Sequence, residues 1–221
     1  MRAKELISYD LPCLKPQNSG DEALVMMDEN KVSHVALVKE GEYLGLISDN
    51  DIYNFFEDTS DLIKNQKLSL MRPFVRSQDH VFEVIKIMGE ARISVVPVLD
   101  DKENYVGSIL SQDLAYTFSK LTSANEPGGV IVLELNINDY SLSHIAQIVE
   151  SEGGKILNCS TSTPADSTKL EVILKINKID LSSIIQTFDR FKYNIKERYH
   201  QSTFDEDLQR RYDLFMNYLN M

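Results

Sequence analysis

The sequence predicts a mixed α/β (α+β) protein built from two β-α-β-β-α repeats, a later β-α-β-β-α-β segment and a C-terminal helix. Three observations lead to this expectation. The first half of the 221-residue chain repeats its own apolar pattern, and a different order of elements follows a polar break. The composition, with 43% hydrophobic and 26% charged residues, is that of a folded globular protein.

The internal repeat becomes visible when segments 61 residues apart are compared. The matching segments are EALVMM at 22–27 with EVIKIM at 83–88, and VSHVALV at 32–38 with ISVVPVL at 93–99. One additional residue in the second hairpin turn then changes the offset to 62, which aligns Gly45 with Gly107 and Asp51 with Asp113. Apolar character is kept at equivalent positions while surface residues differ, as two copies of one unit require.

Each repeat is expected to hold a β-hairpin between two helices. The predicted elements are first helices at about 20–30 and 80–91, strands at 33–38, 43–47, 95–99 and 104–110, and second helices starting near Asp49 and Gln112. One such unit is too small to bury both of its helices, so the two units should pack together.

The strand–helix junctions carry the most informative motif. It reads Gly45-Leu46-Ile47-Ser48-Asp49-Asn50-Asp51 in the first repeat and Gly107-Ser108-Ile109-Leu110-Ser111-Gln112-Asp113 in the second. This pattern resembles the CBS domain, over about residues 5–120, and it is the more specific because it occurs twice in register. The resemblance implies a site for an adenine nucleotide (AMP, ADP or ATP) as a regulatory ligand. A helix N-terminus favours phosphate, and an aspartate can accept hydrogen bonds from ribose hydroxyls.

The resemblance also implies which residues contact the nucleotide. They are Ser48, Asp51, Ser111 and Asp113 at the junctions, His34, Ala36, Val95 and Pro97 on the hairpin strands near the base, and Arg72, Arg76 and Arg92 as possible phosphate contacts. Structural alternatives remain open. Ser48 and Asp51 also fit a capping box, Ser111 could cap the second helix, and His34 could face solvent. Leu110 and Ala36 depart from the family pattern, which has Ser or Thr and often Pro there.

The second half is expected to form a ferredoxin-like sheet with both helices on one face. Its predicted elements are strands at 130–135, 155–162, 169–176 and about 193–199, a helix from Ser141 or Ser143 to about Glu152, and a helix at about 180–191. This order resembles an ACT domain over residues 129–200. The resemblance implies an amino-acid ligand loop at Asp139, Tyr140 and Ser141, or alternatively dimerisation and transmission alone. The combination of a CBS pair and an ACT-like domain is similar to the acetoin-utilisation accessory protein family.

The expected domain boundaries follow from these patterns. They are repeats at 1–60 and 61–121, a linker at 122–128, the ACT-like domain at 129–200 and a C-terminal helix at 201–221. In that last helix, Thr203 and Glu206 fit a capping box before apolar residues at helical spacing.

Charge and motif content exclude several classes of function. A net charge of −11 and a pI of about 4.8 argue against nucleic acid or an anionic membrane as a partner. Cys13, Cys159 and the four histidines form no metal motif, and no catalytic pair or phosphate loop has a recognisable spacing. No apolar run could span a bilayer or serve as a signal peptide, so a cytoplasmic location is expected.

The sequence therefore predicts a non-catalytic regulator without a catalytic cofactor. Its CBS pair would sense an adenine nucleotide, and its ACT-like domain would transmit the signal within a homodimer or to a regulated enzyme. Two alternatives remain: a ligand-independent dimerisation or interaction scaffold with vestigial nucleotide sites, and amino-acid sensing by the ACT-like domain.

Overall fold

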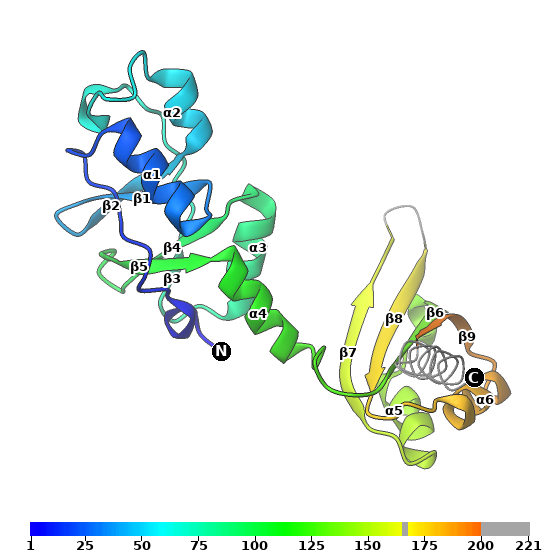
Figure 1. The fold of residues 1–221 in the computed structure, drawn as a ribbon. Coiled ribbons are helices and arrows are strands. Elements are labelled where there is room, and N and C mark those ends of the chain that lie inside the picture. The colour runs from blue at the N-terminus through cyan, green and yellow to red at the C-terminus, as the bar shows by residue number, and fades with distance from the viewer. Residues whose placement is uncertain (165–167, 200–221) are drawn as a thin grey trace, which may run out of the picture. The chain divides into compact units, whose positions relative to one another are not determined.

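The structure is a computed structural model that describes residues 1–164 and 168–199 (Figure 1). The chain divides into two compact units, Met1–Thr117 and Phe118–Met221. The division falls within helix α4 (Ser111–Leu121). The helix expected at 201–221 lies outside the described residues. Within the described part, no helix has both the length and the apolar character needed to cross a bilayer.

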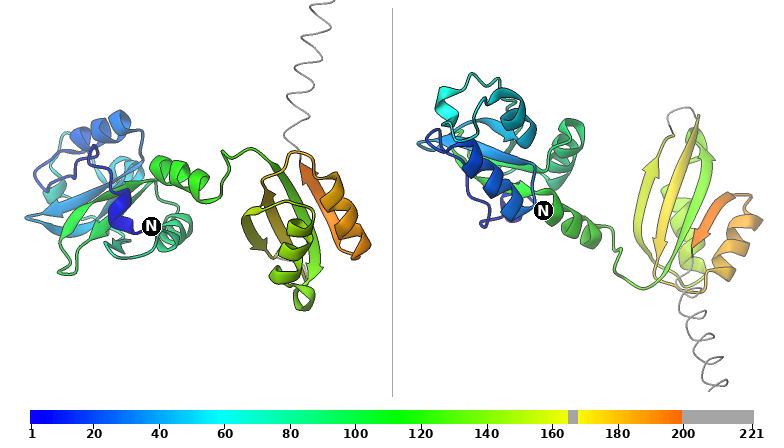
Figure 2. Two further views of the ribbon diagram at one scale, coloured as in Figure 1. Left: turned by 90° about the horizontal axis from the view of Figure 1, so that it is seen from below. Right: turned by 45° about the horizontal axis from the view of Figure 1, so that its top comes forward.

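Unit 1 contains the two expected repeats (Figures 1 and 2). The first has α1 (Gly20–Asn30), β1 (His34–Lys39), β2 (Glu42–Ser48) and α2 (Asp49–Phe55); the second has β3 (Val75–Arg76), α3 (Val81–Ala91), β4 (Val95–Leu99), β5 (Tyr105–Leu110) and α4. In the first repeat the leading strand is a single parallel bridge from Leu14 to Leu37. It is equivalent to the parallel pairing of Val75 with Val98, 61 residues further along at both positions.

The hairpin turns explain why the repeat offset changes. The first turn consists of Glu40 and Gly41, with φ values of 51° and 90°, as the tight turns of two-residue hairpins require. The second hairpin has one more residue between the equivalent pairs, five between Leu99 and Tyr105 against four between Val38 and Tyr43, and Asp100 holds its turn together. The Oδ1 atom of Asp100 accepts the backbone N–H groups of Lys102 and Asn104, both at 2.8 Å.

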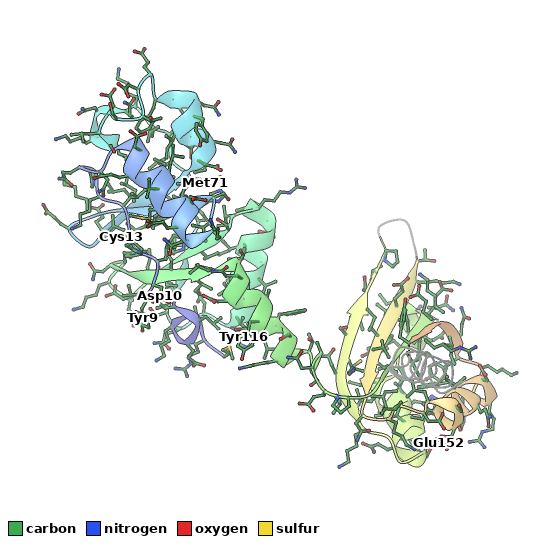
Figure 3. The ribbon with its side chains drawn as sticks, viewed as in Figure 1. Tyr9, Asp10, Cys13, Met71, Tyr116 and Glu152 are labelled. Atoms are coloured by element: carbon green, nitrogen blue, oxygen red, sulfur yellow. The ribbon has the colours of Figure 1, made fainter. Side chains whose placement is uncertain are left out.

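The segment that leads into each repeat crosses over the other repeat. Ser8 donates its backbone N–H to Ser108 of β5 at 2.9 Å, and Leu46 of β2 donates to Met71 at the same distance. Met71 precedes β3, the first strand of the second repeat, and is labelled in Figure 3. The two repeats therefore interlock through both of their leading segments.

The crossings also explain the glycine of the junction motif. A Cβ atom on Gly45 would lie 2.6 Å from Cβ of Leu70, and one on Gly107 would lie 2.4 Å from Cγ2 of Ile7. Real Cβ atoms do not approach neighbours so closely, so a side chain at either position would displace the crossing segment. In this structure the glycines serve the packing of one repeat on the other.

The hydrophobic core of unit 1 is shared between the repeats, as expected for units too small to fold alone. One cluster joins Ala36 and Tyr43 of the first repeat to Val96 of the second. Another cluster joins Ile47 to residues of β4 and β5, including Leu110. Each repeat therefore completes the core of the other.

Unit 2 has the ferredoxin-like order predicted from the sequence. Its elements are β6 (Gly129–Asn136), α5 (Leu142–Ser151), β7 (Ile156–Ser162), β8 (Lys169–Ile176), α6 (Ser182–Arg190) and β9 (Asn194–Tyr199). The four strands form an antiparallel sheet in the order β7-β8-β6-β9. Ile145 of α5 and Phe188 of α6 share one core with Ile131 and Leu133, alternate residues of β6, so both helices cover the same face of the sheet.

Candidate functional site

The first strand–helix junction is a complete capping box. Ser48 Oγ accepts the backbone N–H of Asp51 at 3.1 Å, and Asp51 Oδ2 accepts the backbone N–H of Ser48 at 2.8 Å and its hydroxyl at 2.7 Å. The structural alternative offered by the sequence is therefore confirmed here. One oxygen of the Asp51 carboxylate is occupied in holding the first turn of α2.

We expect Ser48→Ala to destabilise unit 1 by about 1 kcal/mol, because two hydrogen bonds of the cap depend on its hydroxyl. Ser111→Ala is the matched control. Ser111 is exposed, and no side-chain hydrogen bond involves it in the described part of the chain. Urea unfolding of both variants measures the difference. An equal loss in the two variants would contradict the role assigned to Ser48.

The second junction lacks this cap. Helix α4 begins at Ser111 itself, and the preceding residue is Leu110, whose side chain has no hydrogen-bonding atom. The suggestion that Ser111 caps α4 is therefore wrong. Asp113, the equivalent of Asp51, is partly exposed, and its carboxylate has no hydrogen-bond partner among residues 1–164 and 168–199. The second junction thus presents the freer carboxylate of the two.

A pair of serines that the sequence analysis did not single out links the two junctions. Ser33 donates its backbone N–H to Ser94 Oγ at 3.0 Å, and the two hydroxyl oxygens lie 3.3 Å apart. The carbonyl of Ser33 accepts the N–H of Asp49 at 3.2 Å, and that of Ser94 accepts the N–H of Ser111 at 2.9 Å. Each serine therefore joins the start of its own repeat's helix to the other repeat. Ser33 and Ser94 stand at equivalent positions of the two repeats, and this equivalence is the sequence signal that could have identified them.

His34 lies in the same group and is half-buried, which does not fit the alternative of a solvent-facing residue. It pairs with Ser48 across β1 and β2. Its Nδ1 atom lies 3.4 Å from the backbone N of Ser94, 3.2 Å from Ser94 Oγ and 3.0 Å from Ser33 Oγ. Burial lowers the pKa of His34, against a smaller opposing attraction from Asp49 and Asp51. The equivalent pair in the second repeat, Val95 and Leu110, is apolar.

The other residues expected near the base lie in the core. Ala36 is 1% exposed, Val95 is fully buried, and Pro97 is buried as well. Their side chains support the hairpin strands beside the junctions. Contact between them and a nucleotide base stays a prediction.

Of the three arginines expected to contact phosphate, two interact with other residues of the protein. Arg72 donates to the carbonyl of Tyr43 at 2.7 Å and lies over its ring, and Arg76 pairs with Glu103 at 3.3 Å. Arg92 follows α3 in a left-handed conformation and is exposed. Their phosphate contacts stay predictions.

The three residues of the predicted ligand loop in unit 2 have different structural roles. Asp139 accepts the Asn136 amide at 2.8 Å, Tyr140 packs against the core, and Ser141 caps α5 by accepting the N–H of His144. Asp139 and His144 line a cavity of about 450 Å³, whereas Tyr140 and Ser141 do not. The remaining residues around this cavity are Glu134, Leu135, Asn136, Lys169, Phe191, Lys192, Tyr193 and Asn194. Across the described part of the chain, no cluster of three or more His, Cys, Asp or Glu side chains could hold a metal ion.

The family model of the CBS domain matches residues 3–58 and 68–120. The first half of this chain is a CBS domain pair. Two inosine-5'-monophosphate dehydrogenases are similar to the chain. The one from Korarchaeum cryptofilum is 24% identical over 144 residues, covering 64% of this chain and 29% of the relative. The one from Methanocaldococcus jannaschii is 20% identical over 154 residues, covering 68% of this chain and 30% of the relative. The chain thus spans less than a third of these curated relatives.

Solved structures also resemble the CBS pair. A CBS domain pair/ACT domain protein from Thermotoga maritima has a TM-score of 0.48 and 21% identity, covering 54% of this chain and 98% of that chain. CBSX2 in complex with AMP has a TM-score of 0.44 and 17% identity, covering 54% of this chain and 96% of that chain.

The two junctions of the CBS pair differ chemically. The first is polar and internally satisfied, because Ser48, Asp51 and His34 all have partners within the protein. At the second, Asp113 offers both oxygens of its carboxylate at the N-terminus of an 11-residue helix. A ligand that combines hydroxyl donors with a negative group would be accommodated best there, since the carboxylate accepts hydroxyls and the helix N-terminus attracts the anion.

Proposed function

We propose that the CBS pair binds an adenine nucleotide and that the protein is a non-catalytic regulator. CBS domain pairs commonly bind adenine nucleotides such as AMP and ATP, and they are typically regulatory. Of the two junctions, we assign the main site to the second, with Asp113 receiving the ribose hydroxyls.

The observation that carries this proposal is the carboxylate of Asp113, which has no hydrogen-bond partner in the described part of the chain. A carboxylate left without a partner at a helix N-terminus can accept two ribose hydroxyls without breaking a bond inside the protein. Asp51 would offer a single oxygen, because its other oxygen accepts from Ser48. Hydrogen bonds to a charged acceptor stabilise by about 1.5–3 kcal/mol, so this difference is large enough to decide which junction is occupied.

We further propose that unit 2 is ACT-like and transmits the signal to the second subunit of a homodimer or to a regulated enzyme. Its strand order and the placement of both helices on one sheet face support this part of the proposal. Transmission requires the nucleotide to bind two states of the protein with different affinities.

A thermal-shift titration with AMP, ADP and ATP tests the proposal, with GMP and CMP as controls for the base. A specific nucleotide at about 100 times its dissociation constant adds roughly 2.7 kcal/mol to the stability of the unit that binds it. We expect the unfolding temperature of unit 1 to rise by several degrees with one adenine nucleotide and not with the controls. No shift with any nucleotide, together with a stable oligomer, would favour the interaction scaffold.

Amino-acid sensing by unit 2 is the second candidate. Glu134, Asp139, Lys169 and Lys192 bring both signs of charge to the 450 Å³ cavity, as a zwitterionic ligand would need. A panel of amino acids in the same titration tests it. A rise confined to the unfolding of unit 2 would support amino-acid sensing.

A further inference from the structure

His34 lies at one of the polar contacts between the two repeats. Ser33 and Ser94 belong to different repeats, and the Nδ1 atom of His34 lies within 3.4 Å of polar atoms of both. The equivalent residue of the second repeat is Val95, which does not titrate. The CBS pair thus carries a titratable ring on one side of an otherwise pseudo-symmetric contact.

The Nδ1 atom of His34 cannot carry a proton and accept the backbone N–H of Ser94 at the same time. The backbone N–H of Ser94 can only donate, so Nδ1 must present its lone pair, and a neutral ring then carries its proton on Nε2. The hydroxyls of Ser33 and Ser94 can rotate to donate or to accept, but the amide cannot. Protonation would make the N–H group at Nδ1 face the backbone N–H of Ser94, so the ring or Ser94 would have to move.

The charged groups that act on His34 come from α2. Asp49 and Asp51 attract a proton to the ring, and the other neighbours, Ser33, Ser48 and Ser94, are uncharged. Burial outweighs this attraction, so the pKa of His34 in the folded protein lies below its usual value of about 6.5. A lowered pKa means that the associated stability is present above about pH 6.5 and is lost as the pH falls through the lower native value.

We propose that His34 is a proton-operated latch between the two repeats. The neutral ring fixes Ser94, and protonation releases it. Because the carbonyl of Ser94 accepts the N–H of Ser111 at the start of α4, the release also disturbs the junction that carries Asp113. Resting on the proposed function, acidification then weakens nucleotide binding at that junction.

Three proteins test the latch in the absence of nucleotide: the wild type, His34→Asn and Asp49→Asn. Asparagine can place its side-chain oxygen where Nδ1 accepts from Ser94, but it cannot be protonated. We expect the wild type to lose stability between about pH 7.5 and pH 5.5, and His34→Asn to lose clearly less. In Asp49→Asn the loss should begin at the same pH, extend to lower pH and become larger, because the pKa of the unfolded state is unchanged while the native pKa of His34 falls further without one attracting carboxylate. The remaining histidines are common to all three proteins and cancel in the comparison.

A measurement on the wild type keeps the test decisive if a variant does not fold. In an NMR titration, the amide resonance of Ser94 should move with the same midpoint as the ring of His34. The latch would be overturned if the stability of the wild type and that of His34→Asn depended equally on pH. It would also be overturned if the amide resonance of Ser94 did not move as His34 titrates.

Nucleotide titrations at about pH 7.5 and about pH 5.5 then separate the latch from the proposed function. If nucleotide binds, its affinity should fall on acidification in the wild type and stay nearly constant in His34→Asn. An affinity that changes equally in both proteins would contradict the link between the latch and the site. If no nucleotide binds at either pH, the proposed function fails, while the nucleotide-free measurements still decide the latch.

Discussion

Gly107→Ala is expected to destabilise unit 1 by about 2–4 kcal/mol. Gly107 has a φ of 151°, which L side chains rarely adopt, and a Cβ there would lie 2.4 Å from Cγ2 of Ile7. The strain adds to the displacement of the leading segment, which carries the backbone bond from Ser8 to Ser108. Urea unfolding followed by circular dichroism measures the loss.

Gly89→Ala is the matched control. Gly89 lies inside α3, and apart from its chain neighbours and the nearby backbone of its own helix nothing lies within 4 Å of the place where its Cβ would stand. Alanine is the better helix former by roughly 0.5–1 kcal/mol, so this variant should be slightly more stable than the wild type. If Gly107→Ala were as stable as Gly89→Ala, the passage of Ile7 over Gly107 would be wrong.

The second large effect concerns the nucleotide. Asp113→Asn should weaken adenine-nucleotide binding by about 10-fold to 100-fold, because it removes the charge of an acceptor that has no hydrogen-bond partner within residues 1–164 and 168–199. Asp51→Asn should weaken binding much less. Its side-chain oxygen can still accept from Ser48, so the cap of α2 is largely retained. Isothermal titration calorimetry with the nucleotide that gives the thermal shift measures both affinities.

Comparing Asp113→Asn with Asp51→Asn also shows whether the main nucleotide site has been assigned to the wrong junction. A larger loss in Asp51→Asn would place the main site at the first junction, despite the internal bonds of Asp51. Unchanged affinity in both variants, with a wild type that binds, would remove both junctions from the site. A far-ultraviolet circular dichroism spectrum equal to that of the wild type shows that either variant has kept its fold.

The sequence by itself determined the elements and the repeat. Strands 95–99 and 169–176 agree with the structure at both ends, because alternating and continuous apolar runs, turn residues and caps are all read within a few neighbours. The offset of 61 was visible because both copies must bury the same faces. The capping box at Ser48 and Asp51 was equally local, since its two residues are three positions apart.

Only the tertiary structure decided how the two copies meet. The contacts of Ser33 and His34 with Ser94, and the passage of Ile7 over Gly107, join segments from about 60 to 100 residues apart. Periodicity reports which face of an element is buried, but not which distant segment covers it. The sequence therefore placed aspartates at both junctions. The difference between their carboxylates is local as well, because Ser48 caps α2 and Leu110 cannot cap α4. Only the packing of the repeats decided which distant segment covers each junction.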